Sequence, residues 1–372
     1  MDPCDASPRC WFSHRCCCCP LAAVTTPRRP SSCRPPSVQS CRPCSTRRAP
    51  DLVAPGATLT VTIPGEGLWV GATGMADVAQ SVAMKGEHLF GIGSVTKTFT
   101  AAVVLQLRDE GVLSLADTLE AWVPGFPRGD EITLEHLLRH QTGIFDVAYH
   151  DDVVGDVSRD WAPEELVALA AAEDPLFAPG AGYSYSNTNF ILLALVIEAA
   201  SGNGWESEVR SRLLEPVGLA DTFIPTTEDP PGGEATVAHG YFLSDDWTLL
   251  FSPTAGYGCG AMVASGPDLV TWLDALLFGT VLTPASQAEM QTPGELPGGK
   301  VISYGLGLRL RTSDYGFATK LGHGGDAIIY RADAFHLPQA DVTVVALTNG
   351  RAAEARPIAD AAWEILTGET SD

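Results

Sequence analysis

The stretch FGIGSVTKTFTAAVVLQLRDEG, residues 90–111, joins a short glycine-containing segment to a long, mostly apolar run. Its pattern predicts a buried helix from Ser94 to about Glu110, stopped by Gly111. A serine in the first turn of such a helix has a free backbone N–H and faces the positive end of the helix dipole. That position favours the negative charge that develops on a carbonyl oxygen under attack.

Lys97 follows Ser94 at the spacing of one helical turn, so its ammonium group can lie beside the Ser94 hydroxyl. In an apolar cleft such a lysine can act as the base that activates a serine nucleophile. The alternative is a serine at a helix start with a nearby solvated lysine, because S-x-x-K alone is a common pattern.

A second motif, Tyr185-Ser186-Asn187, lies in PGAGYSYSNTNF, directly before a hydrophobic helix. If Tyr185 faces Ser94, it can pass a proton to the leaving group. Asn187 can form a hydrogen bond with the acyl side of a substrate. The alternative is a capping loop, since Ser, Asn and Thr are favoured at helix N-termini.

A third motif, His323-Gly324-Gly325, is expected to end one strand and lead into another. Glycines there let a substrate backbone lie along a strand edge. His323 can assist proton transfer or orient a hydroxyl group in the cleft. The alternative is a glycine-rich hairpin that happens to carry a histidine.

Strand patterns occur at both ends of the chain body, and helical patterns lie between them. The predicted strands are 58–63, 68–72, 304–311, 317–322, 327–336 and 342–348. The predicted helices in addition to the first are 133–140, 162–173, 188–201, 267–278 and about 356–366. This order indicates a mixed α/β (α+β) fold with an antiparallel sheet built from both chain ends, covering helices and an inserted helical lobe.

The expected α/β lobe comprises about residues 51–112 and 290–372, and the helical lobe about 113–289. Active-site groups are expected in the cleft between the two lobes. His136 and His140 lie four residues apart on a predicted helix, a spacing that can bind a metal ion. Neither an H-E-x-x-H motif nor a third ligand accompanies them, so we expect no metal site.

Residues 1–50 differ from the rest in composition, because they are rich in Cys, Pro, Arg and Ser and contain every cysteine except Cys259. We expect a disordered tail there and a folded domain over 51–372. An alternative is a four-cysteine zinc site from the C-x-x-C pairs at 16–19 and 41–44, although the gap between the pairs is longer than usual.

The chain of 372 residues has a formal net charge of -22, with 45% hydrophobic and 18% charged residues. These values are typical of a globular protein and exclude a mostly disordered chain. No apolar run is long enough for a membrane-spanning helix. The acidic balance argues against general nucleic-acid binding, which needs a basic face.

Taken together, the three motifs resemble those of the serine β-lactamase and penicillin-binding superfamily, which read S-x-x-K, Y-x-N and H-x-G. The resemblance is strongest to the branch that holds D-Ala-D-Ala carboxypeptidases, class C β-lactamases and related esterases. The stretches LLRHQTGI and YGLGLRL resemble further parts of that branch, and the similarity covers about residues 54–368. It implies the β-lactamase/transpeptidase-like fold.

The resemblance also implies a role for each motif residue. Ser94 would be the acylated nucleophile, with Lys97 and Tyr185 sharing proton transfer and the identity of the base left open. Asn187 would hold the acyl side of the substrate. His323 would line the opposite wall of the cleft together with Gly325.

Three further features follow from the resemblance. The backbone N–H groups of Ser94 and Asp326 would form the oxyanion hole, and Arg309 would bind a terminal carboxylate of the substrate. Asp326 departs from the hydroxyl residues common in carboxypeptidases of this branch and would repel a carboxylate unless it points away. A helix that usually covers the sheet should precede residue 54, where the sequence does not resemble one.

We therefore expect a cofactor-independent serine hydrolase, carboxypeptidase-like or β-lactamase-like, acting on a small or peptide substrate. The alternatives are a family esterase or D-amino amidase, and a catalytically silent binding protein of the same fold. No secretory signal is visible, so the sequence as written indicates a cytoplasmic protein, or a secreted or periplasmic one if the true N-terminus differs.

Overall fold

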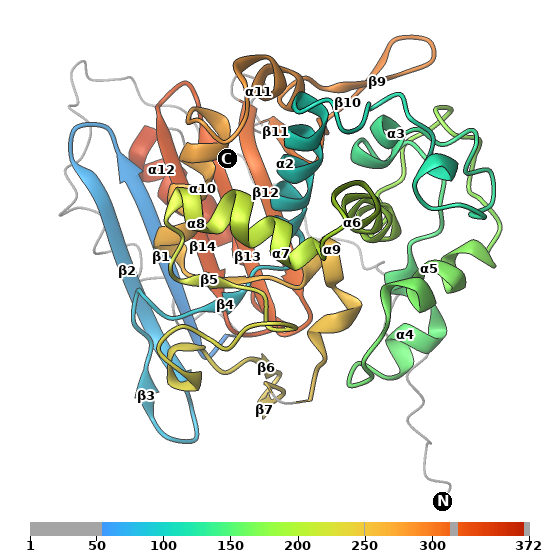
Figure 1. The fold of residues 1–372 in the computed structure, drawn as a ribbon. Helices are drawn as coiled ribbons and strands as arrows, with labels where there is room; N and C mark the ends of the chain where they lie inside the picture. Colours follow the sequence, from blue (N-terminus) through green and yellow to red (C-terminus); the bar gives the residue numbers. More distant parts are fainter. Residues whose placement is uncertain (1–53, 249, 313–318, 368–372) are drawn as a thin grey trace, which may run out of the picture. The chain divides into compact units, whose positions relative to one another are not determined.

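A seven-stranded antiparallel sheet joins the two ends of the chain in the computed structural model, which describes residues 54–248, 250–312 and 319–367 (Figure 1). The strand order is β11-β12-β13-β14-β1-β2-β3. From the N-terminal part come β1 (Gly56–Ile63), β2 (Gly67–Asp77) and β3 (Val82–Ala83). From the C-terminal part come β11 (Arg309–Thr312), β12 (Thr319–Ala327), β13 (Tyr330–Leu337) and β14 (Val342–Thr348). The predicted sheet from both chain ends is confirmed.

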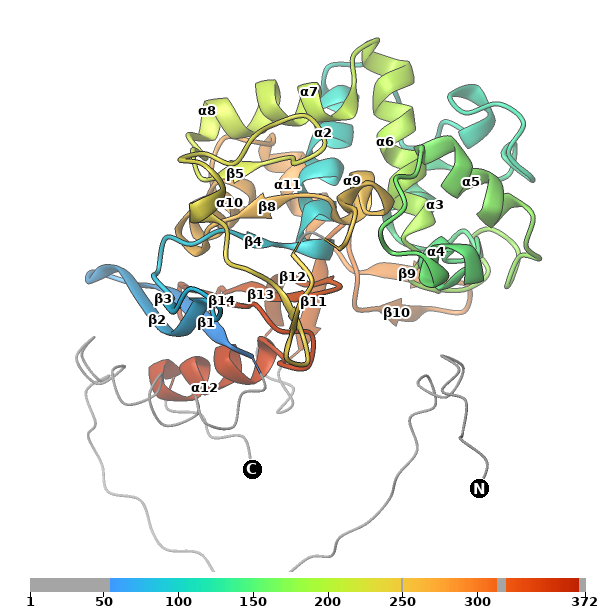
Figure 2. The same cartoon turned by 90° about the horizontal axis from the view of Figure 1, so that it is seen from below.

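Helices cover both faces of this sheet, as Figure 2 shows. On one face lies α12 (Arg356–Thr367), whose Trp363 packs in a cluster with Phe335 and Val344 of the sheet. On the other face lies α10 (Gly266–Leu277), which contacts β1, β13 and β14. The sequence alternation in β1 fits this arrangement, because Leu59 and Val61 belong to the cluster under α12.

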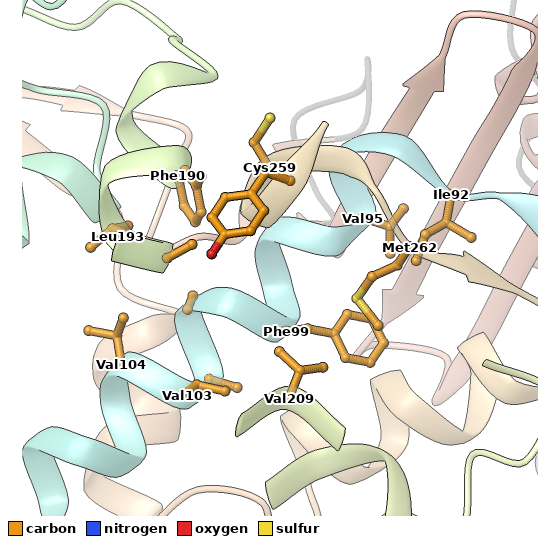
Figure 3. Packing of buried hydrophobic residues seen from close by; sticks show 14 of the residues in the cluster. Ile92, Val95, Phe99, Val103, Val104, Phe190, Leu193, Val209, Cys259 and Met262 are labelled. Carbon is orange, nitrogen blue, oxygen red and sulfur yellow. The ribbon is translucent and has the colours of Figure 1, made fainter. Parts of the chain in front are cut away.

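The helix α2 (Thr96–Asp109) runs through the core and is preceded by the short 3-10 turn η4 (Gly93–Val95). Its apolar side chains, among them Phe99 and Val104, lie in one buried cluster with Phe190, Leu193 and Val209 of neighbouring elements (Figure 3). Phe99 stacks on Trp272 of α10, with ring centroids 3.9 Å apart. Because this helix is buried along most of its length, its first turn is held in one place.

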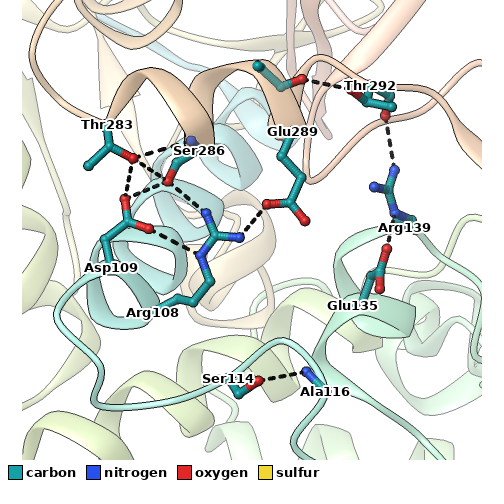
Figure 4. Close-up of polar contacts among 11 residues, drawn as sticks. Arg108, Asp109, Ser114, Ala116, Glu135, Arg139, Thr283, Ser286, Glu289 and Thr292 are labelled. Carbon is teal, nitrogen blue, oxygen red and sulfur yellow. Dashed lines mark hydrogen bonds and ion pairs between the residues drawn. The ribbon is translucent and has the colours of Figure 1, made fainter.

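Polar contacts fix the far end of α2 to α11 (Pro284–Met290), as drawn in Figure 4. Arg108 donates a hydrogen bond of 2.7 Å to Ser286 and forms an ion pair with Glu289. Asp109 accepts a hydrogen bond of 2.9 Å from Thr283, the residue that caps α11. The helix that begins beside Ser94 is therefore anchored at both ends.

The remaining elements lie between residues 90 and 302. The helices and helical turns are η5 (Leu119–Ala121), α3 (Leu134–Leu138), η6 (Val147–Tyr149), α4 (Asp151–Gly155), α5 (Pro163–Ala171), α6 (Thr188–Ser201), α7 (Trp205–Val209), η7 (Arg210–Leu214), α8 (Glu215–Val217), η8 (Glu234–Thr236), η9 (Pro253–Ala255) and α9 (Tyr257–Gly260). Short strands pair as β4 (Phe90–Gly91), β8 (Val263–Ala264) and β5 (Thr222–Phe223), as β6 (Tyr241–Phe242) with β7 (Asp245–Asp246), and as β9 (Gly294–Leu296) with β10 (Lys300–Ile302).

Two strand predictions near the C-terminus are wrong in detail. The strand expected from residue 304 begins only at Arg309, because the chain turns at Gly305 and at Gly307, which has φ +73°. The motif His323-Gly324-Gly325 does not separate two strands but lies within the continuous strand β12. Its glycines permit close contact rather than a turn, since a Cβ on Gly325 would lie 2.0 Å from the carbonyl oxygen of Ile92.

The described residues belong to one compact unit, and the expected boundaries of the two lobes within it stay a prediction. The helix α10 lies inside the range expected for the helical lobe, yet it packs on the sheet. In the described part of the chain, no helix is both long and apolar enough to cross a membrane. The expected tail, its zinc alternative and the question of a first covering helix all concern residues before 54, outside the described residues.

Candidate active site

Ser94 and Lys97 meet at the start of α2, as their spacing predicted. The Nζ atom of the fully buried Lys97 donates a hydrogen bond of 3.0 Å to Ser94 Oγ. It also donates to Oδ1 of Asn187 and to the carbonyl oxygen of Cys259, each at 2.7 Å. Three acceptors around one nitrogen match the three N–H groups of an ammonium ion.

Tyr185 reaches the same serine from the loop before α6. Its hydroxyl donates a hydrogen bond of 2.8 Å to Ser94 Oγ. Two cations lie close to its ring, with Lys97 Nζ and the guanidinium carbon of Arg309 each 5.0 Å from the ring centroid. The structure thus brings the first two motifs together on one hydroxyl oxygen.

Asn187 is held from its other side by Asp146, which the sequence analysis did not single out. Asp146 accepts hydrogen bonds from the backbone nitrogen of Asn187 at 3.0 Å and from its Nδ2 at 3.1 Å. Burial raises the pKa of Asp146, partly offset by these hydrogen bonds and by the charge of Lys97. No local pattern marks this aspartate, because its partner lies 41 residues away in the sequence.

His323 lies in β12 in a fully buried position. Its Nδ1 donates to the carbonyl oxygen of Gly324 at 2.6 Å, and its Nε2 accepts from the Tyr304 hydroxyl at 3.0 Å. Burial, together with the charges of Arg309 and Lys97, holds the pKa of His323 well below its usual value. Both ring nitrogens of this neutral imidazole are therefore occupied, and proton transfer by His323 stays a prediction.

His140 belongs to the same buried region. Its Nδ1 accepts the backbone N–H of Ser186 at 3.2 Å, and its ring centroid lies 4.3 Å from that of Tyr185. The helix α3 ends at Leu138 and His140 has φ +56°, so the expectation that His136 and His140 share a helix is wrong. Burial holds the pKa of His140 well below its usual value.

The strand β12 and the segment before Ser94 touch through their backbones. A Cβ on Gly93 would lie 2.5 Å from the carbonyl oxygen of Asp326 and 2.7 Å from its backbone nitrogen. Gly93 also has φ +49°, a conformation that glycine adopts without strain. The backbone nitrogens proposed for an oxyanion hole are thus on adjacent segments, although that role stays a prediction.

Asp326 and Arg309 differ in how their charges are compensated. The Asp326 carboxylate forms an ion pair of 2.7 Å with Arg331 and accepts from the backbone N–H of Ile328. Within the described part of the chain, the exposed Arg309 guanidinium has no carboxylate at ion-pair distance. The repulsion expected from Asp326 is therefore reduced, while the charge of Arg309 remains available beside Tyr185.

This arrangement can support attack by a serine on a carbonyl carbon. Ser94 Oγ contacts two groups that can exchange protons with it, Lys97 and Tyr185. The pairing of β12 with β11 ends at Gly322, opposite Arg309, so residues 323–326 have no partner in β11.

Comparisons with known proteins show the family to which the chain belongs. A family model described as Beta-lactamase matches residues 46–368. Penicillin-binding protein 4* of Bacillus subtilis (strain 168) is 28% identical over 271 residues, which cover 67% of this chain and 58% of that protein. The chain thus spans little more than half the length of this curated relative.

Two solved structures resemble the fold over nearly the whole of their own chains. A D-stereospecific amidohydrolase from Streptomyces sp. has a TM-score of 0.77 at 28% identity and covers 90% of this chain and 100% of its own. The D-amino acid amidase from Ochrobactrum anthropi SV3, complexed with L-phenylalanine amide, has a TM-score of 0.79 at 25% identity. That comparison covers 88% of this chain and 99% of the amidase.

Proposed function

Because the chain belongs to the β-lactamase family, we propose that it is a serine hydrolase that forms an acyl-enzyme on Ser94. The observation that carries this proposal is the contact of Ser94 Oγ with both Lys97 Nζ, at 3.0 Å, and the Tyr185 hydroxyl, at 2.8 Å. Such an assembled nucleophile supports catalysis over the alternative of a silent binding protein.

In the proposed reaction, one of Tyr185 and Lys97 is deprotonated, and this group takes the proton of Ser94 Oγ as that oxygen attacks the substrate carbonyl carbon. The carbonyl oxygen becomes negatively charged beside the backbone N–H groups of Ser94 and Asp326. The bond to the leaving group then breaks, and the leaving nitrogen or oxygen takes up the proton. Water attacks the resulting ester, which releases the acid and restores the Ser94 hydroxyl.

Arg309 supports substrates that carry a carboxylate next to the bond that is cut. Its exposed guanidinium lies 5.0 Å from the ring centroid of Tyr185, and therefore close to Ser94. An arginine without an ion-pair partner among the described residues suits a planar carboxylate. The first candidate substrates are peptides ending in D-Ala-D-Ala, and β-lactams, whose carboxylate occupies a similar place.

A second candidate is hydrolysis of D-amino acid amides, with esters as a related possibility. It is supported by the match to the D-amino acid amidase along nearly the whole of that enzyme. An amide of this kind has no carboxylate beside the cleaved bond. Binding of the first class of substrate should therefore depend on Arg309, whereas binding of the second class should not.

The proposal is tested by measuring turnover with four compounds: a D-Ala-D-Ala peptide, benzylpenicillin, D-phenylalanine amide and a p-nitrophenyl ester. We expect turnover of at least one compound, and its loss in Ser94→Ala. Turnover that persists unchanged in Ser94→Ala contradicts the proposed nucleophile. Absence of both turnover and covalent labelling with all four would favour the silent binding protein.

A further inference from the structure

Asp146 is the residue that caps the start of the turn η6. Its carboxylate is largely buried, and Oδ1 accepts the backbone N–H of Ala148 at 3.2 Å. This contact caps the turn and needs only one of the two carboxylate oxygens. The second oxygen, Oδ2, is directed to the side chain of Asn187 instead, at 3.1 Å from Nδ2.

The chemistry of this contact fixes the orientation of the Asn187 amide. An ionised carboxylate only accepts hydrogen bonds, so the NH₂ group of Asn187 must face Asp146. Oδ1 of Asn187 then faces Lys97, where it accepts from Nζ at 2.7 Å. With the amide reversed, its NH₂ group would meet the ammonium group of Lys97, and two donors would face each other.

The three side chains form a buried series of alternating acceptors and donors. A negative carboxylate and a positive ammonium lie on opposite sides of a neutral amide, and Lys97 is among the charges that affect Asp146. One Nδ2 hydrogen of Asn187 is used by Asp146, and the other remains to donate to a substrate. The contact with Asp146 thus supports both functions of the Asn187 amide, which are to accept a hydrogen bond from Lys97 and to donate one to the substrate.

We propose that Asp146 is a positioning residue, which sets the orientation of the Asn187 amide and so preserves the three acceptors of Lys97. This inference rests on the proposed function, because Lys97 and Asn187 act in its acylation step. Asp146 itself touches neither Ser94 nor, in this proposal, the reacting atoms. Its role is to prevent the Asn187 amide from adopting the reversed orientation. In that orientation Lys97 would lose an acceptor, and the NH₂ group would no longer be placed to donate to the acyl group of the substrate.

The loop around Asp146 has anchors of its own, so an isosteric substitution should leave it folded. The backbone N–H of Val147 donates to the Thr188 hydroxyl at 3.0 Å, and that hydroxyl donates to the carbonyl oxygen of Phe145 at 2.7 Å. In Asp146→Asn, the remaining oxygen can still accept from the backbone of Ala148 and Asn187. The change is at the position of Oδ2, where the substitution replaces an accepting oxygen with a donating NH₂ group that faces Asn187.

The test is a set of three variants: Asp146→Asn, Asn187→Asp and the double variant that carries both. Asp146→Asn places two NH₂ groups against each other, and Asn187→Asp places two carboxylates against each other. In the double variant, the new amide at 146 donates to the new carboxylate at 187, whose other oxygen can accept from Lys97. Asp151→Asn, which removes an exposed charge nearby, serves as the matched control.

The first measurement needs no substrate: thermal unfolding of the full chain and its variants. We expect both single variants to unfold at lower temperature than the wild type, and the double variant to unfold at a higher temperature than either. If the two substitutions lower the unfolding temperature additively, the amide is not oriented by Asp146 and the inference is overturned.

The second measurement is the rate at which benzylpenicillin labels Ser94, followed by intact mass. We expect Asp146→Asn to slow labelling by about 10- to 100-fold, the size of effect for a lost hydrogen bond to a charged group. The double variant should label faster than Asn187→Asp, which shares its loss of the amide donor to the substrate, and Asp151→Asn should match the wild type. If Asp146→Asn labels at the wild-type rate, the positioning role is overturned, even when unfolding shows the coupling.

The two measurements separate this inference from the proposed function. If wild type and variants alike give neither label nor turnover with any of the four compounds, the proposed function fails, and with it the effect on acylation. If the wild type reacts but the variants show no coupling, only the inference about Asp146 fails.

Discussion

The hydroxyl of Tyr304 lies 3.0 Å from Nε2 of His323, and both side chains are fully buried. Because Nδ1 of the same histidine donates to a backbone carbonyl, Nε2 must accept from the tyrosine in the neutral ring. The ring of Tyr304 also lies edge-on to that of Tyr185, at 6.1 Å between centroids. Tyr304 and His323 thus form a fixed support for Tyr185, the residue that contacts Ser94.

Removing the Tyr304 hydroxyl should destabilise this support. Tyr304→Phe leaves the buried Nε2 of His323 without a donor, at an expected cost of about 1–3 kcal/mol in the free energy of unfolding. Tyr183→Phe is the matched control, because the Tyr183 ring lies in the same aromatic group but is partly exposed. Urea unfolding of both variants tests this, and equal losses of stability would contradict the account.

Two buried histidines predict that stability falls in mild acid. The pKa values of His140 and His323 are held well below the usual value by burial, so the folded chain binds fewer protons there than the unfolded chain. As the pH falls below about 6.5, the unfolded state gains protons first, and each histidine lowers stability by up to about 1.4 kcal/mol per pH unit. Urea unfolding at several pH values between 5 and 7.5 measures this slope.

Buried carboxyl groups change the dependence of stability on pH in the opposite direction, so a control variant is necessary. Burial raises the pKa of Asp146 and of Asp333, so the folded state takes up their protons first as the pH falls. The comparison of wild type with His323→Gln isolates the histidine, because both chains keep these carboxyl groups. An identical pH slope in the two proteins would mean that His323 is not buried in its neutral form.

Gly93 should tolerate no side chain. In Gly93→Ala, the new Cβ would lie within 3 Å of the backbone of Asp326 and force Ser94 and β12 apart. We expect loss of acylation by more than about 100-fold, since displaced backbone donors no longer stabilise the oxyanion. Gly111→Ala is the control, because Gly111 also has positive φ but has open space around it. Equal acylation rates in the two variants would contradict the close approach of β12 to Ser94.

Arg309 should distinguish the two candidate substrate classes. In Arg309→Gln, KM for a D-Ala-D-Ala peptide should rise by about 10-fold or more, the value of a lost charged hydrogen bond. KM for D-phenylalanine amide, which lacks the carboxylate, should change little. Steady-state kinetics with both compounds measures the ratio. An equal change for both compounds would exclude carboxylate binding as the role of Arg309.

The sequence predicted those parts of the fold that depend on local pattern. The helix 188–201 agrees with α6, because its apolar run ends at Gly202, which adopts φ +76°. The strand 342–348 agrees with β14, an apolar segment that is buried on both faces. The strand expected from residue 304 failed, because the turn at Gly307 depends on a tertiary contact in which its N–H donates to the carbonyl oxygen of Leu138.

The candidate site divides in the same way. Ser94, Lys97 and Tyr185 were predicted from motifs, and the structure brings them together within hydrogen-bond distance. Asp146 and Tyr304 were not predicted, because each is a buried polar partner that reaches its contact only through the tertiary fold. The family and the fold class inferred from the joint resemblance are confirmed by the family model and by the solved structures.

The most direct test of the central claim is an intact-mass time course of the full chain with each of the four compounds, benzylpenicillin first, with loss of the compound assayed in the same samples. The account predicts, for at least one of them, either a covalent adduct that maps to Ser94 or hydrolysis, and neither in Ser94→Ala. With benzylpenicillin, a stable adduct would indicate slow deacylation, and hydrolysis without an adduct would indicate a working β-lactamase. An adduct or hydrolysis that survives Ser94→Ala would contradict the assignment of Ser94 as the nucleophile.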